Sequence, residues 1–299
     1  ASMPRIDAIR RHDLTDAQWE LLEPLLPVRS GLGRPLAFGL RDLIDGVRHR
    51  ARTGAPWRDV PPVYGPWWRV YALFRSWQIL GVWQRIESGM LDEADRRGML
   101  DWGAFSVDST SVRAHVHAAG ARRDSVSRVA GEPDDHALGR SRGGWGTKVH
   151  LACESGRGVV STLLTAGQAG DPQHLIPVLN QVRVARPGRV GRPRQRPDRV
   201  LADAAYSSRG NRSWLARRGI RATIPIKADQ ARHRAARGSR GGRPPKFDEV
   251  SYHDRHAVEC GINGMKQYRG FATRCDKLAV RYQATVRVVN ISRWLKQLS

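Results

Sequence analysis

Three short apolar runs near the middle of the chain constrain the fold most. They are AFSVDSTSV (104–112), TKVHLACE (147–154) and GVVSTLLTAG (158–167), each bounded by glycine or by polar residues. Runs of this length that are rich in Val and Thr predict β-strands. Three such runs in succession predict an antiparallel meander.

The segments that follow predict alternating helices and strands. A helical pattern, PQHLIPVLNQV (172–182), precedes an apolar strand in VLADAAY (200–206), and a second helix (209–219) precedes RATIPI (221–226) as a fifth strand. The order β-β-β-α-β-α predicts an α/β fold, a mixed five-stranded sheet flanked by helices.

The chain before this sheet has a different pattern. Residues 12 to about 100 repeat apolar positions at helical spacing, and Thr15 or Asp16 is a candidate N-cap for the first helix. We therefore expect an all-helical N-terminal domain (1–100) and a catalytic domain (101–299). Six of the ten tryptophans precede residue 100, and we expect most of them in a compact helical core, namely Trp57, Trp67, Trp68, Trp77 and Trp83.

The charge balance indicates a polyanionic partner. The 51 Lys and Arg residues exceed the 28 Asp and Glu residues by 23. Nucleic acid is the usual partner of such a chain, because cationic side chains displace counterions from phosphates. Basic loops are expected near 117–145, 184–199 and 227–249, with a mobile basic loop over 227–246 and a linker of phosphate-binding arginines over 183–199. Basic side chains of the helical region are further candidates: Arg48, Arg50, Arg52, Arg58, Arg69 and Arg75.

Several protein classes are disfavoured. The sequence has no run of about 18 apolar residues and no apolar stretch near its start, so we expect a cytoplasmic protein with no membrane partner. Its three cysteines are scattered, which argues against a disulfide framework and a cysteine zinc site.

Three carboxylates suggest the chemistry. Asp108 and Asp203 interrupt apolar strand patterns, and they lie close together if the first and fourth strands are neighbours. A helix then supplies Glu259. Converging carboxylates repel one another unless hard divalent cations neutralise them, which favours a two-ion Mg²⁺ site for phosphoryl transfer.

Local roles are open for each carboxylate. Asp108 also fits a turn cap, Asp203 fits a helix N-cap, and Glu259 fits an ion pair with Arg255 four residues before it. On one helix, Tyr252, Arg255, Glu259 and Lys266 share a face, which sets a carboxylate between two cations.

The combined motifs resemble the bacterial insertion-sequence transposases of the DDE class. The branch in question carries Tyr, two residues, Arg, three residues, Glu, six residues and Lys, and Tyr252, Arg255, Glu259 and Lys266 match every spacing. The other similar regions are VDSTSVRAH, VLADAAYSSRGNR, GRSRGGWGTKVHLA, DLTDAQWELLEPLLP and GAPWRDVPPVYGPWWRVYALFRSW.

The resemblance implies an RNase H-like core and a divalent-metal site. It implies that Asp108, Asp203 and Glu259 are catalytic residues that bind Mg²⁺, two ions in all, with Mn²⁺ as a substitute. It also implies that Tyr252, Arg255 and Lys266 contact the DNA backbone. Further candidate DNA contacts are Arg243, Lys246 and Lys148.

One departure concerns the interval from Asp203 to Glu259. It spans 56 residues, too few for the large β-rich insertion that some relatives use to form hairpin intermediates. In its place stands the basic stretch 227–246, for which we hypothesise contacts to flanking or target DNA.

These features predict a cut-and-paste DNA transposase. It would act as a homodimer on double-stranded DNA, bind terminal inverted repeats, expose a 3′-hydroxyl end and join it to target DNA. The alternatives are a structure-selective DNA nuclease that cleaves without joining, and an inactive DNA-binding descendant of a transposase.

Overall fold

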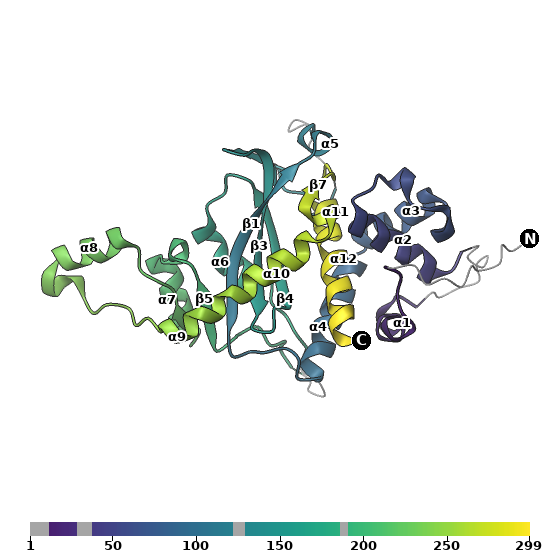
Figure 1. Ribbon diagram of the computed structural model, residues 1–299. Helices are drawn as coiled ribbons and strands as arrows, with labels where there is room; N and C mark the ends of the chain where they lie inside the picture. Colours follow the sequence, from purple (N-terminus) through teal and green to yellow (C-terminus); the bar gives the residue numbers. More distant parts are fainter. Residues whose placement is uncertain (1–11, 29–37, 122–128, 186–190) are drawn as a thin grey trace, which may run out of the picture.

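The computed structural model describes residues 12–28, 38–121, 129–185 and 191–299, with a helical region at one end of a mixed sheet (Figure 1). The helical region contains α1 (Asp16–Leu22), η1 (Glu23–Leu25), α2 (Leu40–Thr53), η2 (Trp57–Asp59), η3 (Pro62–Tyr64), α3 (Trp67–Ile79) and α4 (Val82–Arg96). Of the two candidate N-caps of α1, Thr15 is the one used, because its hydroxyl accepts a hydrogen bond from Gln18 N. Helix α2 ends at Gly54, whose φ of 70° is left-handed.

The helical core holds only part of the predicted tryptophan set. Trp77 and Trp83 are buried and Trp57 packs against the core, but Trp67 and Trp68 are 37% and 53% exposed. The prediction is wrong for these last two residues. The buried face of α3 is formed by Val70, Phe74 and Trp77. Trp68 points to another face of the helix, and Trp67 is the first residue of α3, before the buried face begins.

The sheet contains all five predicted strands and two short ones that were not predicted. Its strands are β1 (Phe105–Ala114), β2 (Gly139–Ser141), β3 (Gly144–Glu154), β4 (Val159–Ala166), β5 (Arg199–Ala202), β6 (Arg221–Thr223) and β7 (Thr273–Arg274). The order is β2-β3-β1-β5-β6, with β4 also paired to β3 and β7 to β1.

Strand directions give the sheet its RNase H-like character. Strand β3 is antiparallel to β1 and to β4, as the meander predicted, whereas β5 is parallel to β1 and β6 is parallel to β5. Three antiparallel strands followed by two parallel ones, with β1 in the middle, are the RNase H-like arrangement. The parallel pair sets Ala202, the last residue of β5, beside Val107 within β1, which continues to Ala114.

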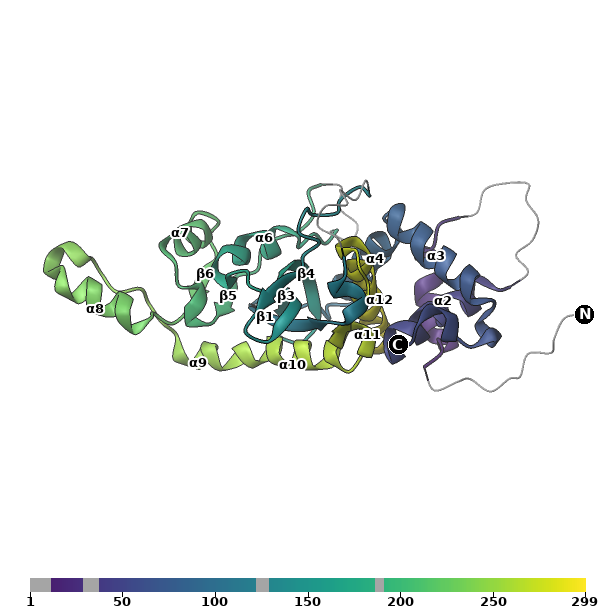
Figure 2. The ribbon, with the colours of Figure 1, turned by 90° about the horizontal axis from the view of Figure 1, so that it is seen from above.

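Helices cover both faces of the sheet (Figures 1 and 2). One face carries η4 (Asp171–His174), α6 (Leu175–Asn180) and α7 (Arg209–Arg217), and the other carries α10 (His256–Lys266). Before α10 come η5 (Ala204–Tyr206), α8 (Ala228–Ala236), η6 (Gly238–Gly241), α9 (Glu249–Tyr252) and η7 (His253–Arg255). After it come α11 (Arg269–Ala272) and α12 (Ala279–Leu298). Between Asp203 and Glu259, where every residue is described, the only strand is β6, so no β-rich insertion is present there.

The C-terminal helix joins the two parts of the chain. Helix α12 packs against α2, α4 and β4, and both Asn290 and Trp294 donate hydrogen bonds to the carbonyl oxygen of Val159. Buried side chains form one continuous hydrophobic cluster from the helical region through the sheet. The division into domains 1–100 and 101–299 stays a prediction. No helix in the described part of the chain is long and apolar enough to cross a membrane.

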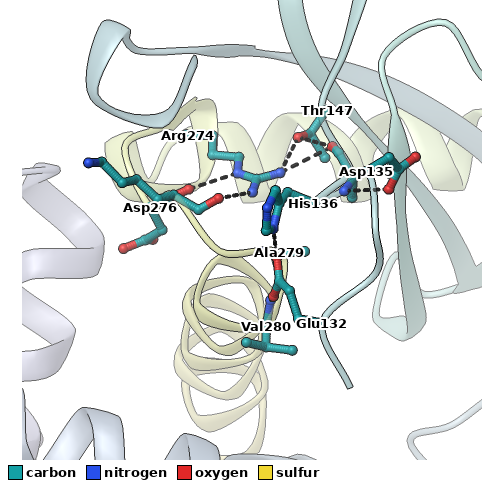
Figure 3. A network of polar contacts seen from close by, with 10 residues as sticks. Glu132, Asp135, His136, Thr147, Arg274, Asp276, Ala279 and Val280 are labelled. Carbon is teal, nitrogen blue, oxygen red and sulfur yellow. Dashed lines mark hydrogen bonds and ion pairs between the residues drawn. The ribbon is translucent and has the colours of Figure 1, made fainter. Parts of the chain in front are cut away.

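Part of the long segment between β1 and β3 is also ordered, by α5 (Val116–Ala119), β2 and a polar network (Figure 3). The Glu132 carboxylate accepts hydrogen bonds from the backbone N–H groups of Ala279 and Val280 at the start of α12. The buried Arg274 donates to Thr147 Oγ1 at 2.6 Å. These contacts tie the described part of the segment to the C-terminal elements, while residues 122–128 lie outside the described chain.

The segment expected as a mobile basic loop is partly helical. Helix α8 and η6 occupy much of 227–246, because alanines and arginines favour a helix up to Ala236, before Gly238 with its φ of 53°. These elements project from the end of the molecule opposite the N-terminal helices (Figures 1 and 2). The basic residues therefore form an extended arm, which we call the α8 arm (227–246).

Candidate active site

The first two candidate carboxylates come from neighbouring parallel strands. Val107 of β1 lies beside Ala202 of β5, and the next residues along the two strands are Asp108 and Asp203. The condition stated for the closeness of Asp108 and Asp203, that the first and fourth predicted strands are neighbours, is therefore met. Asp108 stands on the central strand of the sheet and Asp203 at the point where β5 ends.

Both carboxylates make local backbone contacts. Asp108 Oδ1 accepts a hydrogen bond from Ser109 N at 2.8 Å, and Asp203 Oδ1 accepts one from Ala205 N at 2.9 Å as the N-cap of η5. Burial raises the pKa of Asp108 above its ordinary value, against the lowering effects of the Ser109 N–H and Arg255, and the charge of Asp203 raises it further. Because burial and the charge of Asp203 both disfavour ionised Asp108, a cation at this position would stabilise the carboxylate.

Glu259 reaches the same region from the helix that covers the sheet. It lies in the first turn of α10, and its side chain is 50% exposed. Helix α10 packs closely on β3 at Gly261, where an added Cβ would lie 2.5 Å from Cys153 Sγ. Only glycine allows this approach, which therefore fixes the height of Glu259 above the sheet.

Arg255 lies between two of the carboxylates. Its Nη1 is 3.1 Å from Asp108 Oδ2, and its Nη2 donates a hydrogen bond to Glu259 Oε1. The ion pair with Glu259 that the i,i+4 spacing allowed is thus formed, and the same guanidinium also reaches β1. The Tyr252 ring centroid lies 5.8 Å from the guanidinium carbon.

The other members of the spacing motif lie on separate helical pieces. A single helix was expected from Tyr252 to Lys266, but α9, η7 and α10 follow one another instead. Lys266 is exposed in the last turn of α10. Arg243 and Lys246 are exposed near the end of the α8 arm. Their roles as DNA contacts stay predictions.

Lys148 is engaged inside the protein. Its ammonium donates to the Ala169 carbonyl oxygen at 2.8 Å and lies 3.0 Å from Asp171 Oδ1, and only 15% of its side chain is exposed. Asp171 also accepts a hydrogen bond from Ser109 Oγ at 2.7 Å. A DNA contact by Lys148 stays a prediction, and this ion pair would have to open for it.

The predicted 183–199 linker shows similar engagement. Residues 186–190 lie outside the described chain. Arg194 stacks on Trp102, Arg196 donates to the Arg218 carbonyl oxygen, and Arg199 pairs with Asp248. Phosphate binding by these arginines also stays a prediction.

Two residues beside the site escaped the sequence reasoning. Asp171, after β4, is held by Ser109 and Lys148 on the face of β1 opposite Asp108. Tyr206 is 1% exposed and lies in the short turn η5, which begins directly after Asp203. Burial, together with the charges of Asp171, Asp108 and Asp203, raises the pKa of Tyr206 above its usual range. The sequence contained a signal for each residue: Asp171 follows a predicted apolar strand, and Tyr206 lies three residues after Asp203.

The donor set fits a hard divalent cation by its chemistry. Asp108, Asp203 and Glu259 offer carboxylate oxygens, the ligands that Mg²⁺ prefers. Among the described residues, however, no three His, Cys, Asp or Glu side chains are grouped closely enough to hold a metal ion. Arg255 occupies the space between Asp108 and Glu259, so a complete ligand set requires Arg255 to move.

Two family models match the chain. One, described as a transposase DDE domain, matches residues 103–291, and the other, a putative transposase of the IS4/5 family, matches residues 14–87. Together they span the sheet and most of the helical region.

Several proteins are similar to part of the chain. An uncharacterized protein y4sN of Sinorhizobium fredii is 35% identical over 39% of this chain and 88% of its own length. A 16.2 kDa uncharacterized protein of insertion element IS402 from Burkholderia cepacia is 32% identical over 40% of this chain and 84% of its length. A putative transposase for insertion sequence element IS6501 from Brucella ovis is 32% identical over 32% of this chain and 67% of its length.

A solved structure shows a weaker likeness. The cryo-EM structure of the piggyBac transposase synaptic complex with hairpin DNA aligns with 94% of this chain and 74% of its own chain, at a TM-score of 0.39 and 11% identity. That score is too low to support an inference about this chain.

Proposed function

The chain belongs to the DDE transposases, enzymes that generally use divalent metal ions, and on that premise we propose that it cleaves and joins DNA at the ends of an insertion sequence. One observation carries the proposal. Asp108 on β1 and Glu259 on the covering helix contact the same guanidinium, that of Arg255, and Asp203 directly follows the neighbouring parallel strand of an RNase H-like sheet.

The three carboxylates have the catalytic roles in this proposal. Asp108, Asp203 and Glu259 hold two Mg²⁺ ions, for which Mn²⁺ substitutes. When bound, such ions activate the attacking oxygen and stabilise the leaving oxygen of a phosphodiester. Asp108 is fixed by the strand and by Ser109 N, and Asp203 by its cap on η5, so two of the ligands are positioned before DNA arrives.

Cationic side chains near the carboxylates then hold the cleaved end. Arg255 offers a planar donor group that matches a phosphate, and Lys266 offers an exposed ammonium about three turns later, at the end of α10. Tyr252 lies against Arg255 and limits the positions that the guanidinium can take. Water or a 3′-hydroxyl attacks in the same site in the two successive steps.

One DNA-binding surface is proposed on α3. Among the described residues, Arg58, Arg69 and Arg75 make no ion pair, although Arg58 lies over Trp67 and Arg69 over Trp68. The remaining candidates from the helical region are engaged elsewhere: Arg48 pairs with Asp45, Arg50 with Asp276, and Arg52 bonds the Gln267 carbonyl oxygen. Arginines without an acidic partner beside exposed tryptophans favour contact with the terminal repeat.

The α8 arm supplies a second surface. It carries seven cations against one acid, Asp229, and most of these side chains are exposed: Lys227, Arg232, Arg234, Arg237, Arg240, Arg243 and Lys246. Its position at the far end from α3 suits contact with flanking or target DNA while α3 holds the terminal repeat (Figure 2). Because two ends must be joined together, we propose a homodimer whose twofold axis relates them.

A joining assay tests this function. The purified protein is incubated with Mg²⁺, labelled end DNA and a supercoiled plasmid, beside Asp108→Ala, Asp203→Ala and Glu259→Ala. Joined products that disappear in all three variants support the transposase. Cleavage without joining supports a nuclease, and binding with neither reaction supports an inactive DNA-binding descendant.

A further inference from the structure

Arg255 connects two carboxylates that come from different elements. Asp108 belongs to β1 and Glu259 to α10, and the two Nη atoms of one guanidinium contact one carboxylate each. The side chain is 21% exposed, so it is largely withdrawn from solvent. It therefore supplies a positive charge between Asp108 and Glu259, where the proposed function requires a metal ion.

Two cations cannot share this space. A guanidinium and a divalent ion compete for the same carboxylate oxygens and repel each other strongly at a few ångströms. Asp108 and Glu259 can act as ligands of one ion only after Arg255 has released at least one of them. Without a replacement anion, that release leaves the guanidinium partly buried and unpaired, which is costly.

A DNA phosphate is a suitable replacement. Arginine binds carboxylates and phosphates with the same planar donor geometry. Arg255 is the last residue of η7, near the Tyr252 ring, and the helix that follows it leads to the exposed Lys266. A phosphate held there takes the guanidinium away from the carboxylates without leaving it unpaired.

We propose that Arg255 is an exchangeable counter-charge that couples metal binding to DNA binding. Without DNA it neutralises Asp108 and Glu259 and disfavours metal binding. When DNA binds, Arg255 moves to a backbone phosphate, and the carboxylates become available as ligands. This inference rests on the proposed function and adds an order of events: the carboxylates bind the metal ions fully only after DNA has bound.

Linkage makes the proposal quantitative. If DNA raises the affinity for the metal, the metal must raise the affinity for DNA by the same factor. We expect a factor of about ten or more in the wild-type protein, within the usual range for coupled sites. In Arg255→Gln, Mn²⁺ binding without DNA should strengthen by about tenfold, and the coupling factor should fall towards one.

The experiment measures Mn²⁺ binding to the full chain by electron paramagnetic resonance, with and without a saturating duplex whose 3′ end is already exposed. Lys296→Gln is the matched control, because it removes one exposed positive charge, on α12, from a residue with no role in the proposed site. Arg255→Lys keeps the charge but cannot bridge both carboxylates, so it should lose most of the coupling. Asp108→Ala should lose Mn²⁺ binding, which assigns the signal to this site.

The outcomes separate the two proposals. Tighter DNA-free Mn²⁺ binding and little coupling in Arg255→Gln, together with normal coupling in Lys296→Gln, support the exchange. The same DNA-free affinity and the same coupling in Arg255→Gln and wild type overturn it and leave the proposed function standing. A wild-type protein that binds neither Mn²⁺ nor DNA contradicts both.

Discussion

The Arg255 guanidinium lies 3.1 Å from the Asp108 carboxylate, although the two residues are 147 positions apart in the sequence. The contact exists because η7 and α10 cross the strand on which Asp108 stands, and because Ser106 of β1 also bonds the Asp254 carbonyl oxygen. The charge of the two carboxylates nearest Arg255 is thereby balanced in part by a residue of the protein itself.

Asp108→Asn should stabilise the fold while it abolishes activity. Burial raises the pKa of Asp108, so its ionisation opposes folding as pH rises above the ordinary value of 3.8, and this cost is fully present above the raised pKa. We expect a gain of about 1 kcal/mol in the free energy of unfolding at neutral pH.

Thermal melting across a pH series checks this expectation. The difference from wild type should narrow as pH falls towards 3.8. With end DNA bound, Mg²⁺ should raise the wild-type melting temperature and leave that of Asp108→Asn unchanged. A variant less stable than wild type at neutral pH would count against the assigned cause.

The α8 arm should contribute to the salt dependence of DNA binding. Replacing Arg240 and Arg243 by Gln should weaken binding and reduce the slope of log K against log salt by about 0.9 for each phosphate that is no longer neutralised. Fluorescence anisotropy at several salt concentrations measures the slope. The matched control is Arg85→Gln with Arg96→Gln, two exposed α4 cations with partners inside the protein. Equal slopes for wild type and the arm variant would show that the α8 arm does not contact DNA. An unchanged slope after deletion of 227–246 would show the same.

The exposed face of α3 should matter for binding and little for stability. Trp68→Ala is expected to weaken binding to the terminal repeat by about tenfold and to change the free energy of unfolding by less than about 0.5 kcal/mol. Trp77→Ala, on the buried face of the same helix, should instead cost about 3 to 5 kcal/mol of stability. If Trp68→Ala changes the dimerisation constant and not DNA affinity, the face belongs to a protein interface.

Arg274 should be among the most important residues for stability. It is fully buried and donates to Thr147 Oγ1 and to the carbonyl oxygens of Ala137, Asp276 and Lys277 (Figure 3). Arg274→Met leaves these acceptors unpaired and should lower the free energy of unfolding by about 3 kcal/mol or more. Chemical denaturation measures the change, with the exposed Arg142→Met as the control. A decrease below about 1 kcal/mol would mean that water replaces the guanidinium.

Local pattern predicted five of the strands and allowed β1 and β5 to be neighbours, because apolar runs and a crossover helix leave few topologies open. The closeness of Asp108 and Asp203 was expected on the condition that these strands are neighbours, and the pairing meets that condition. It did not predict that Trp67 and Trp68 are exposed, since helical spacing alone does not show where packing ends. The helix in the α8 arm was not predicted, because the Arg and Gly content of 227–246 favoured a loop, although the alanines of this segment favour a helix.

Long-range partners were beyond the sequence. Arg255 bonds Glu259 four residues away, which spacing suggested, but its bond to Asp108 depends on how α10 crosses the sheet. The engagement of Lys148 by Asp171 likewise follows from the path of the chain after β4. Because of these contacts, Arg255 and Lys148 form ion pairs inside the protein, whereas the sequence identified them as candidate DNA-binding cations.

The most direct test of the central claim is metal-ion rescue of Asp108→Cys. A thiolate binds Mg²⁺ poorly and softer ions better. We predict that this variant loses cleavage of end DNA in Mg²⁺ by about a thousandfold, the equivalent of roughly 4 kcal/mol, and regains a substantial part of it in Mn²⁺. Wild-type cleavage by Asp108→Cys in Mg²⁺ would contradict the claim that Asp108 is a metal ligand of a phosphoryl-transfer site.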